Sequence, residues 1–451
     1  MGSVQELKST AQRIMSAALR AADPAAAIAR TLARGAGGFL VNGRRCPVEG
    51  KLYLVAVGKA SQGMAAAALG ILGESVTEAI VVSPRGYGRT LEASPPRISL
   101  LETGHPVPDE KGIAAAHRVS ALVAGMGERD TCIVLLSGGG SSLLPLPLPP
   151  VTLSEKMETT ALLLDSGADI REINTVRKHI SAIKGGRLAE RARGRIVTLA
   201  ISDVVGDSID SIASGPTVRD PTAFADAREI LARYRLLERV PAAVRRTIED
   251  GVAGRVPETP KDLPARHEAL VIASNRIAVE AAMREASACG FAPLLLTTFL
   301  AGEAREAGRL IAEIAREARA SARPIAAPAC IVAGGETTVT VTGGGKGGRN
   351  QEIALAAAVE LAGESGILIT SFATDGREGT TEAAGGYASA DTLAAGMRAG
   401  LDPRACLADN DSHSFLSAAG ECIVTGATGT NVNDITFALI DERGSGIRSS
   451  S

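Results

Sequence analysis

Short apolar runs that stop at a glycine or a polar residue recur along this chain, with stretches of helical length between them. In the first half these runs are residues 52–57, 79–83, 131–136 and 195–201. Strands that alternate with helices form βαβ units, which pair in parallel and bind ligands at the carboxyl ends of the strands. We therefore expect an α/β fold whose first domain has a Rossmann-like parallel sheet.

A second series of apolar runs follows in the other half. It comprises residues 268–273, 292–297, 330–333, 337–342, 366–372 and 422–425. Residues 337–342 (TTVTVT) alternate as a half-buried strand does, and a tight turn at residues 334–336 would pair them with the run before it. This hairpin predicts a mixed sheet in a second α/β domain.

Breaks in these patterns predict the domain boundaries. The chain opens with an Ala-rich helix over residues 6–34. The first domain is expected at residues 1–240, and a helical, Pro-rich connection at residues 241–266. The second domain is expected at residues 267–441, followed by a disordered tail at residues 442–451.

Composition narrows the class of partner. Aromatic residues make up only 2% of the chain, Trp is absent and the net charge is −2. Neither stacking platforms nor a basic field is therefore present to bind nucleic acid or anionic lipid. The six cysteines are scattered without a CxxC pair, and no apolar window has the length of a membrane span. These features predict a cytoplasmic protein that binds small molecules, and neither nucleic acid nor a membrane.

A lysine follows the first strand, within residues 58–63 (GKASQG). A dinucleotide-binding GxGxxG would lie here, but Ala60 replaces the middle glycine, and residues 83–86 after the next strand supply no acid for a ribose. Lys59 at a helix N-terminus instead suits a carboxylate or a phosphate. The alternative is a surface lysine on a tight turn.

A glycine- and serine-rich loop, residues 137–142 (SGGGSS), follows a strand of pure core character. Successive glycines let backbone N–H groups surround phosphate oxygens, although the loop is not a Walker P-loop. The alternative is a flexible connection. The candidate ligand-binding residues of this loop are Ser137, Gly138, Gly139, Gly140, Ser141 and Ser142.

Two further features follow in the first half. Residues 174–187 form a basic helical stretch that breaks at a double glycine, so Lys178 and Lys184 are candidate phosphate ligands, with a solvated helix face as the alternative. Asp203 follows the strand at residues 195–201. An acid there can hold Mg²⁺ through water or accept a proton from a substrate hydroxyl, whereas a helix cap is the alternative.

The densest cluster of the second half is residues 343–352 (GGGKGGRNQE). Its glycines open a helix near Asn350, so backbone N–H groups, Lys346 and Arg349 should converge at the positive end of that helix. An arginine can present a planar fork to a phosphoryl group in transfer. Glu336, in the turn before this run, belongs to the same predicted site.

Two more loops of the second half carry candidates. Asp375 ends a strand and Glu378 follows closely, which makes this strand end a second candidate for binding a metal or a nucleotide. Residues 426–434 (GATGTNVND) form a Gly/Asn loop that would line the site, with Asn431 as its ligand-binding candidate.

Six of these runs, taken in order, resemble the glycerate 2-kinase family with a C-terminal MOFRL domain. They are SGGGSS, INTVRKHISAIKGGRLA, ISDVVGDSIDSIASGPT, GGETTVTVTGGGKGGRNQE, ATDGREGT and TGATGTNVNDI. The resemblance covers residues 55–440, with little contribution from residues 220–266, and places the MOFRL region at about residues 328–438. It implies an active site in the cleft between two α/β domains, Mg-ATP as phosphoryl donor, and conversion of D-glycerate to 2-phosphoglycerate. Lys59 and Arg349 match the lysine and arginine that are proposed as catalytic in that family.

The mechanism that this resemblance suggests is a hypothesis. The carboxylate of glycerate docks on Lys59 and the loop at residues 137–142, while Arg349 and Mg²⁺ neutralise the γ-phosphoryl group of ATP. Asp203 accepts the hydroxyl proton, and Asp203 and Asp375 are the candidate metal ligands. The choice of the 2-hydroxyl comes from the resemblance alone. The sequence leaves the oligomeric state open, with a homodimer among the options.

Two competing functions stay open at this point. Relatives of the family have been called hydroxypyruvate reductases, so an NAD(P)H-dependent reductase is the alternative enzyme, which the broken fingerprint at residues 58–63 disfavours. A sensor that binds a phosphorylated sugar acid is the non-enzymatic alternative. It would need one anion site, whereas glycine-rich strand ends occur in both halves of this chain.

Overall fold

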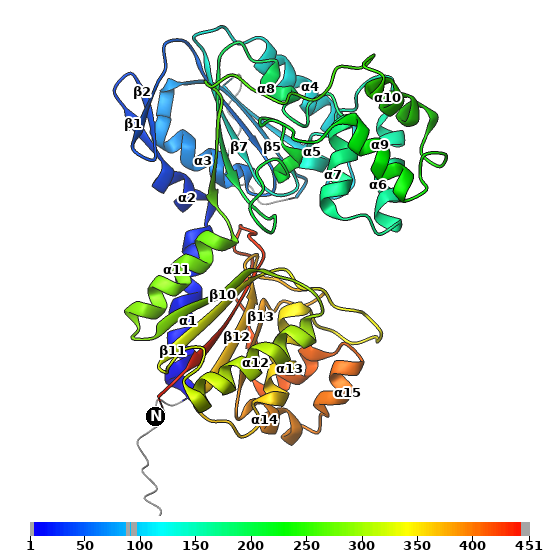
Figure 1. The fold of residues 1–451 in the computed structure, drawn as a ribbon. Helices are drawn as coiled ribbons and strands as arrows, with labels where there is room; N and C mark the ends of the chain where they lie inside the picture. The colour runs from blue at the N-terminus through cyan, green and yellow to red at the C-terminus, as the bar shows by residue number, and fades with distance from the viewer. Residues whose placement is uncertain (1–3, 87–90, 92–96, 443–451) are drawn as a thin grey trace, which may run out of the picture. The chain divides into compact units, whose positions relative to one another are not determined.

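The computed structural model describes residues 4–86, 91 and 97–442, and the chain forms two compact units (Figure 1). One unit is Pro24–Ile272. The other combines Met1–Asp23 with Ala273–Ser451, so the chain passes from one unit to the other twice. Among the described helices, none is long and apolar enough to cross a membrane.

A six-stranded sheet forms the centre of the unit Pro24–Ile272, in the order β6-β5-β4-β7-β8-β9. All strand pairs from β6 through β8 are parallel. This is the doubly wound order 3-2-1-4-5-6, in which the direction of winding reverses between the first and fourth strands, here β4 and β7. The predicted Rossmann-like parallel sheet is confirmed. The strands are β4 (Leu52–Val57), β5 (Val76–Pro84), β6 (Ile98–Thr103), β7 (Thr131–Leu136), β8 (Arg195–Ile201) and β9 (Glu268–Ala273).

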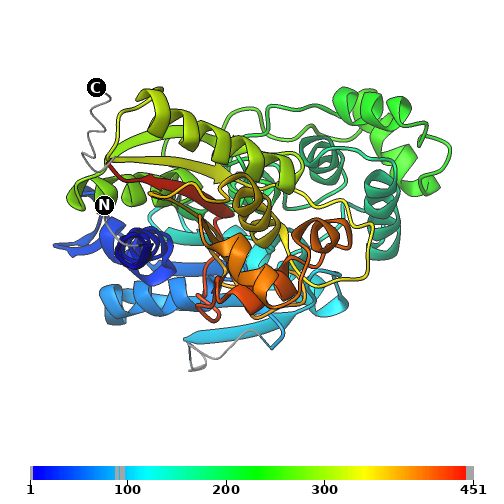
Figure 2. The same cartoon turned by 90° about the horizontal axis from the view of Figure 1, so that it is seen from below.

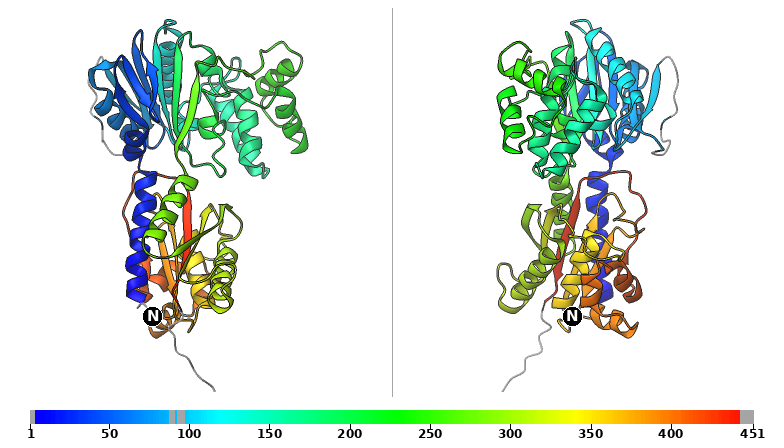
Figure 3. Two further views of the ribbon diagram at one scale, coloured as in Figure 1. Left: turned by 60° about the vertical axis from the view of Figure 1, so that its left-hand side comes forward. Right: turned by 90° about the vertical axis from the view of Figure 1, so that its right-hand side faces the viewer.

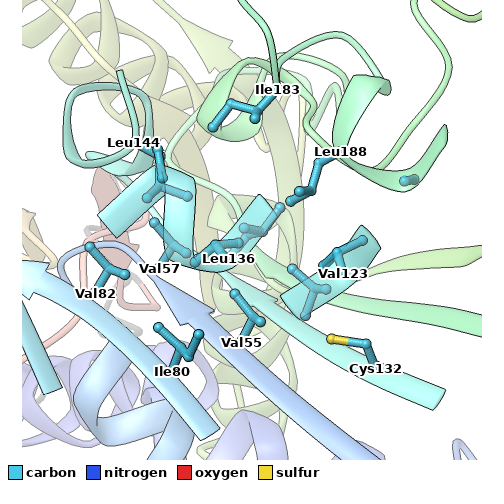
Figure 4. Packing of buried hydrophobic residues seen from close by; sticks show 14 of the residues in the cluster. Val55, Val57, Ile80, Val82, Val123, Cys132, Leu136, Leu144, Ile183 and Leu188 are labelled. Carbon is cyan, nitrogen blue, oxygen red and sulfur yellow. The ribbon is translucent and has the colours of Figure 1, made fainter. Parts of the chain in front are cut away.

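The hydrophobic core of this unit contains side chains from both the strands and the helices. Val55 and Val57 of β4, Val82 of β5 and Leu136 of β7 lie in one buried cluster with Leu188 of α8 (Figure 4). β-branched residues fit the pleated surface of a buried parallel sheet, which explains the apolar runs in the sequence.

Helices and a small antiparallel sheet complete the unit. Four of the helices, α6, α7, α9 and α10, pack around a second apolar cluster to one side of the sheet (Figures 1 and 2). The small sheet has the order β1-β2-β3. The elements are α2 (Pro24–Thr31), β1 (Leu32–Gly35), β2 (Gly38–Val41), β3 (Arg44–Pro47), α3 (Ser61–Leu72), η1 (Gly73–Ser75), α4 (Glu110–Ala124), α5 (Gly140–Leu143), α6 (Leu153–Asp165), α7 (Ile170–His179), α8 (Arg187–Glu190), η2 (Ile212–Ser214), α9 (Phe224–Arg233) and α10 (Ala242–Val252).

The other unit has a six-stranded mixed sheet in the order β10-β11-β15-β12-β13-β14. Only β10 and β11 pair in parallel, and the remaining pairs are antiparallel, so the predicted mixed sheet is confirmed. The strands are β10 (Ala292–Leu300), β11 (Ala329–Gly335), β12 (Ile367–Ala373), β13 (Gly385–Ser389), β14 (Cys422–Ile423) and β15 (Asp434–Ile440).

Helices cover both faces of this mixed sheet. α1 packs on α11 against one face, and α12 and α13 pack together against the other (Figures 1 and 3). The helices of the unit are α1 (Val4–Ala22), α11 (Asn275–Ala288), α12 (Ala304–Ser321), α13 (Arg349–Glu360), α14 (Thr392–Arg398), α15 (Pro403–Ala408) and α16 (Ser412–Ala419).

The hairpin predicted at residues 331–342 is wrong. Residues 337–342 form no strand and make a single bridge, between Thr338 and Glu303. Their backbone amides bond instead to loop groups: that of Thr340 donates to the Glu303 carboxylate, and that of Thr342 to Asn410 Oδ1. The antiparallel partner of β11 is instead β15 (Asp434–Ile440), and its parallel partner is β10.

The observed units also correct the predicted domain boundaries. The predicted helix at residues 6–34 is broken at Pro24, which lacks an N–H for a continuous helix and starts α2 instead. α1 then packs in the unit that holds residues 273–451. The strand Glu268–Ala273, expected in the second domain, lies in the parallel sheet beside β8, and α10, expected in a connection, packs inside the same unit. Residues 443–451 of the predicted tail lie outside the described residues.

Candidate functional site

The loops after β4 and β7 are held together at the switch point of the parallel sheet. The amide of Ala60 donates to Ser137 Oγ at 3.0 Å, and the amide of Lys59 donates to the Gly138 carbonyl at 2.9 Å. Gly58 has φ +130°, and a Cβ there would lie 2.1 Å from Ser137 Oγ. Only glycine therefore permits this close approach, which sets the position of Lys59 beside the loop.

Three polar side chains lie close to the glycines of the 137–142 loop. A Cβ at Gly138 would lie 2.1 Å from a carboxylate oxygen of Asp203, and a Cβ at Gly139 would lie 2.8 Å from His105 Nε2 and 3.4 Å from Lys59 Cγ. Lys59 and Asp203, predicted from separate strand ends, are thus brought to the same loop. Among the backbone hydrogen bonds of the described residues, the amides of Gly138 and Gly139 donate to no carbonyl.

His105 is a residue of this site that the sequence did not reveal. It follows β6, a strand that was not predicted, by two residues. Burial, and then the charge of Lys59, lower the pKa of His105, so the neutral imidazole is favoured beside the lysine. A prediction of β6 would have placed His105 at the carboxyl edge of the sheet with the other candidates.

Ser142, Gly140 and Ser141 make contacts that hold the loop in its conformation. Ser142 Oγ donates to the Gly139 carbonyl at 3.0 Å, and a Cβ at Gly140 would lie 2.8 Å from the side chain of Ala213. Lys184 donates from Nζ to the Ser141 carbonyl at 2.9 Å and to its hydroxyl at 3.0 Å. Lys184, predicted as a phosphate ligand, therefore lies against this loop and not on a solvated helix face.

Lys178 lies apart from the loop's polar groups and is neutralised by acids. Its Nζ lies 2.8 Å from Asp210 Oδ2 and 3.2 Å from Asp220 Oδ1, and the lysine is buried. Two carboxylates around one ammonium leave little attraction for a further anion. The structure therefore favours a stabilising role for Lys178 over the predicted phosphate binding.

Arg349 begins α13 in the other unit and is held by two acids. Its Nε and Nη2 donate to the carboxylate of Asp434, and its Nη1 lies 2.8 Å from Glu336 Oε1. A guanidinium has five N–H donors, so the two bonds to Asp434 leave others for a ligand. Burial raises the pKa of Asp434 to about 6, against the opposing effect of Arg349, so Asp434 is ionised at neutral pH.

The N-terminus of α13 already holds an anion from the protein. Glu378 accepts hydrogen bonds from the amides of Asn350 and Gln351, at 2.6 Å and 3.1 Å, and from the Asn350 side chain at 2.7 Å. The prediction that these amides are open to a ligand is therefore corrected. Burial raises the pKa of Glu378 to about 7, with a further contribution from Asp434.

The glycine run at residues 343–348 is also bonded within the protein. The amides of Gly343, Gly344 and Lys346 donate to side chains of the segment at residues 409–411, each at 3.0 Å. A Cβ at Gly343 would lie 2.4 Å from the backbone of that segment. These glycines allow two loops to pack closely, so the expected cradle of open amides is absent at these three positions.

Asp375 and Asn431 lie on neighbouring loops at the end of β12. Asp375 is exposed and accepts a hydrogen bond from the Arg377 amide at 3.1 Å, while Asn431 Oδ1 accepts one from the Asn433 amide at 3.1 Å. A Cβ at Gly376 would lie 2.0 Å from the carbonyl oxygen of Gly426, in the loop at residues 426–434. The structure thus brings these two predicted loops together.

The donor set suits a metal that is shared with a ligand. Among the described residues, no group of three or more His, Cys, Asp or Glu side chains could hold a metal by itself. Mg²⁺ commonly binds through one or two carboxylates, with water and substrate phosphates completing its shell. Single carboxylates such as Asp203 and Asp375 fit that pattern.

These features define a class of protein. A doubly wound α/β sheet with a lysine, an acid and a glycine-rich loop at its switch point is the architecture of an α/β protein that binds small anionic ligands. Two family models match the chain: a domain of unknown function (DUF4147) at residues 10–249 and the MOFRL family at residues 329–434. The chain belongs to the glycerate 2-kinase family that combines these two domains, as the motifs indicated.

Known relatives match along nearly the whole chain. Glycerate 2-kinase of Pyrococcus horikoshii is 44% identical over 440 residues, covering 97% of this chain and 98% of that protein. A protein of Agrobacterium vitis, provisionally named hydroxypyruvate reductase, is 45% identical over 432 residues. This match covers 95% of this chain and 93% of that protein. The crystal structure of glycerate kinase from Thermotoga maritima has a TM-score of 0.86 and 41% identity, covering 97% and 100% of the two chains.

Proposed function

We propose that this protein is a glycerate 2-kinase, which transfers the γ-phosphoryl group of ATP to the C2 hydroxyl of D-glycerate. The observation that carries the proposal is the full-length similarity to the Pyrococcus horikoshii glycerate 2-kinase, which leaves no domain of that relative unmatched. The site agrees with it, because Lys59, Asp203 and the open amides of the 137–142 loop converge at one sheet edge. A cytoplasmic location stays a prediction.

In this mechanism the unit Pro24–Ile272 binds and activates the acceptor. Lys59 attracts the carboxylate of glycerate, and the amides of Gly138 and Gly139 donate hydrogen bonds to its oxygens. Asp203 accepts the proton of the C2 hydroxyl as its oxygen attacks the γ-phosphorus. A bond then forms between that oxygen and phosphorus while the bond from phosphorus to the leaving oxygen of ADP breaks.

Arg349 is the second residue that the family resemblance assigns to catalysis, and Asp434 fixes the orientation of its guanidinium. Its N–H groups would donate hydrogen bonds to phosphoryl oxygens. Asp203 and Asp375 are separate candidates for holding Mg²⁺, whose charge would offset that of the phosphoryl oxygens. Positioning and charge neutralisation supply most of the rate in phosphoryl transfer, so pre-oriented cations suit this chemistry.

A direct assay tests the proposal. Purified protein with Mg-ATP and D-glycerate should release ADP, and phosphorus NMR of the product should show phosphate on the C2 oxygen. Phosphate on the C3 oxygen would leave a kinase of different regiochemistry. Failure to release ADP with D-glycerate and with other small hydroxy acids would reject the kinase function.

Hydroxypyruvate reduction is the second candidate, because of the Agrobacterium vitis relative and because the order 3-2-1-4-5-6 also occurs in dinucleotide-binding sheets. The site opposes it: Gln62 donates at 3.0 Å to buried Ser83 near the end of β5, and neither of the described residues 85 and 86 that follow β5 is an acid that could bind a ribose. Loss of NADH absorbance on mixing the protein with hydroxypyruvate would support the reductase. Unchanged absorbance would remove it.

A further inference from the structure

Lys184 contacts the 137–142 loop, and two further basic side chains, Lys156 and Arg177, lie within electrostatic reach of Lys184. Lys184 binds Ser141 through Nζ, as described above. Lys156 lies on the buried face of α6, and Arg177 lies on α7, which packs against α6. Burial lowers the pKa of Lys184, and the charges of Lys156 and Arg177 lower it further, which places the three groups within electrostatic reach of one another.

These cations are buried without a partner of opposite charge. Lys156 is 5% exposed and Lys184 is 1% exposed, while Arg177 is partly exposed. Within the described residues, Lys156 Nζ and Arg177 Nε have no hydrogen-bond partner, and no acid forms an ion pair with any of the three. Burying unpaired positive charge is costly, so proteins rarely place lysines in this way without a ligand.

Lys178 provides a comparison within the same helix. Lys178 is buried, as Lys156 and Lys184 are, but Asp210 and Asp220 neutralise its charge. Within the described residues, carboxylates therefore pair with a buried lysine one position away from Arg177, and none pairs with Lys156, Arg177 or Lys184. The difference favours a ligand as the source of negative charge for these three groups.

We propose that Lys156, Arg177 and Lys184 form an oxyanion-binding site beside Ser141, which receives a phosphate or carboxylate group of a reactant. The choice of ligands rests on the proposed function, whereas the presence of an oxyanion site does not. The site would extend the ligand-binding surface inward from Lys59 and the open amides of the loop. Ser141, which is partly exposed, connects the cations with the surface.

Equilibrium binding to the full chain tests the site. Calorimetry would compare inorganic phosphate, ADP and D-glycerate binding to the natural protein and to Lys156→Met, which keeps the side-chain length and removes the charge. Loss of a buried charge that contacts the ligand should weaken binding at least about tenfold. A loss confined to phosphate and ADP identifies a phosphate subsite, and a loss confined to D-glycerate identifies a carboxylate subsite.

Controls separate this inference from folding defects and from the proposed function. Lys111→Met removes an exposed lysine of α4 and should leave all three dissociation constants unchanged. Arg177→Met, at a partly exposed position, provides a second variant if Lys156→Met does not fold. Unchanged binding of all three ligands in the folded variants would overturn the site. Binding that weakens as expected in a protein without kinase activity would reject the proposed function and leave the site in place.

Discussion

The two glycine-rich loops of this protein have similar compositions and different hydrogen-bonding patterns. In the 137–142 loop the amides of Gly138 and Gly139 donate to no backbone carbonyl of the described residues, and the glycines bring Lys59, His105 and Asp203 close to the backbone. In the 343–348 loop the amides are bonded to the segment at residues 409–411.

The two loops also differ in their charged neighbours. α13 has a carboxylate of its own, Glu378, bonded to its first amides. The loop that leads into α5 has the Asp203 carboxylate beside Gly138, while Lys156 Nζ has no hydrogen-bond partner among the described residues. Glycine content therefore indicates close approach of the backbone to another group, and only the structure shows whether that group is a ligand or a second loop.

The largest expected effect is the loss of turnover when either proposed catalytic cation, Lys59 or Arg349, is removed. Lys59→Ala and Arg349→Ala should each reduce kcat by about 10²–10³-fold, because each removes a cation that stabilises the transferring phosphoryl group or its acceptor. Steady-state kinetics with D-glycerate and Mg-ATP would measure this. Lys51→Ala, at an exposed position, is the matched control. Near-normal turnover in both variants would remove these assignments, provided that circular dichroism shows native folds.

A second pair of variants addresses the comparison of the loops directly. Gly139→Ala places a Cβ 2.8 Å from His105 at φ +83°, whereas Gly344→Ala meets no atom within 4 Å and has no positive φ. The first should raise the KM for D-glycerate by about tenfold or more, since backbone strain costs about 1–3 kcal/mol and displaces the open amides. The second should leave KM within about twofold. Equal effects of the two substitutions would contradict the contrast between the loops.

Asn410→Ala tests whether the 343–348 loop is primarily structural. The Asn410 side chain accepts from the amides of Thr342 and Gly343 and donates to Glu352 at 2.8 Å, while being 6% exposed. Its loss should lower the free energy of unfolding by about 2–3 kcal/mol, because several buried polar groups lose their partner. Urea unfolding would measure this. A stable variant that has lost substrate affinity would instead assign the loop to ligand binding.

The smallest expected effect is a pH dependence at the N-terminus of α13. The pKa of Glu378 is raised from 4.5 to about 7 in the folded protein, so this acid binds its proton more tightly when folded. Its ionisation therefore opposes folding, and its contribution to stability should decline as pH rises from about 4.5 to about 7. Between these pH values, the free energy of unfolding should therefore fall by about 1–2 kcal/mol less in Glu378→Gln than in the natural protein. A change in stability that is the same at every pH does not affect this difference.

Urea unfolding at pH 5 and pH 8 would measure the slope, with exposed Glu382→Gln as the control. An identical pH slope in Glu378→Gln and in the natural protein would show that this buried carboxylate does not titrate in the range.

Prediction from sequence succeeded where the chain's pattern and the local structure coincide. The runs at residues 52–57, 131–136 and 195–201 became β4, β7 and β8 with the same bounds, because short continuous apolar runs that end at a glycine or a polar residue are typical of buried parallel strands. It failed at residues 337–342, where the alternating pattern of a strand lies in a loop bonded to side chains. Alternation describes an edge or half-buried strand only if another strand is available to pair with it.

The candidate site was predicted in part for the same reason. Lys59, Asp203 and the 137–142 loop each follow a predicted strand, and parallel topology brings such strand ends together. His105 was missed because β6 was missed, and Lys156 was missed because a lysine in a helix is usually exposed. Lys178 and Lys184 look alike in sequence, yet one is paired with two acids and the other binds Ser141.

The sequence by itself determined the fold class, the family and the strand ends that could carry chemistry, because those features depend on local pattern and on chain order. Tertiary structure decided which backbone amides remain open, which cations are neutralised and to which unit α1 and β9 belong. The physical reason is that hydrogen bonds and ion pairs are satisfied by groups distant in sequence, such as Asp434 for Arg349 and Glu378 for Asn350. A composition can indicate that a group needs a partner, whereas only the folded chain shows whether it has one.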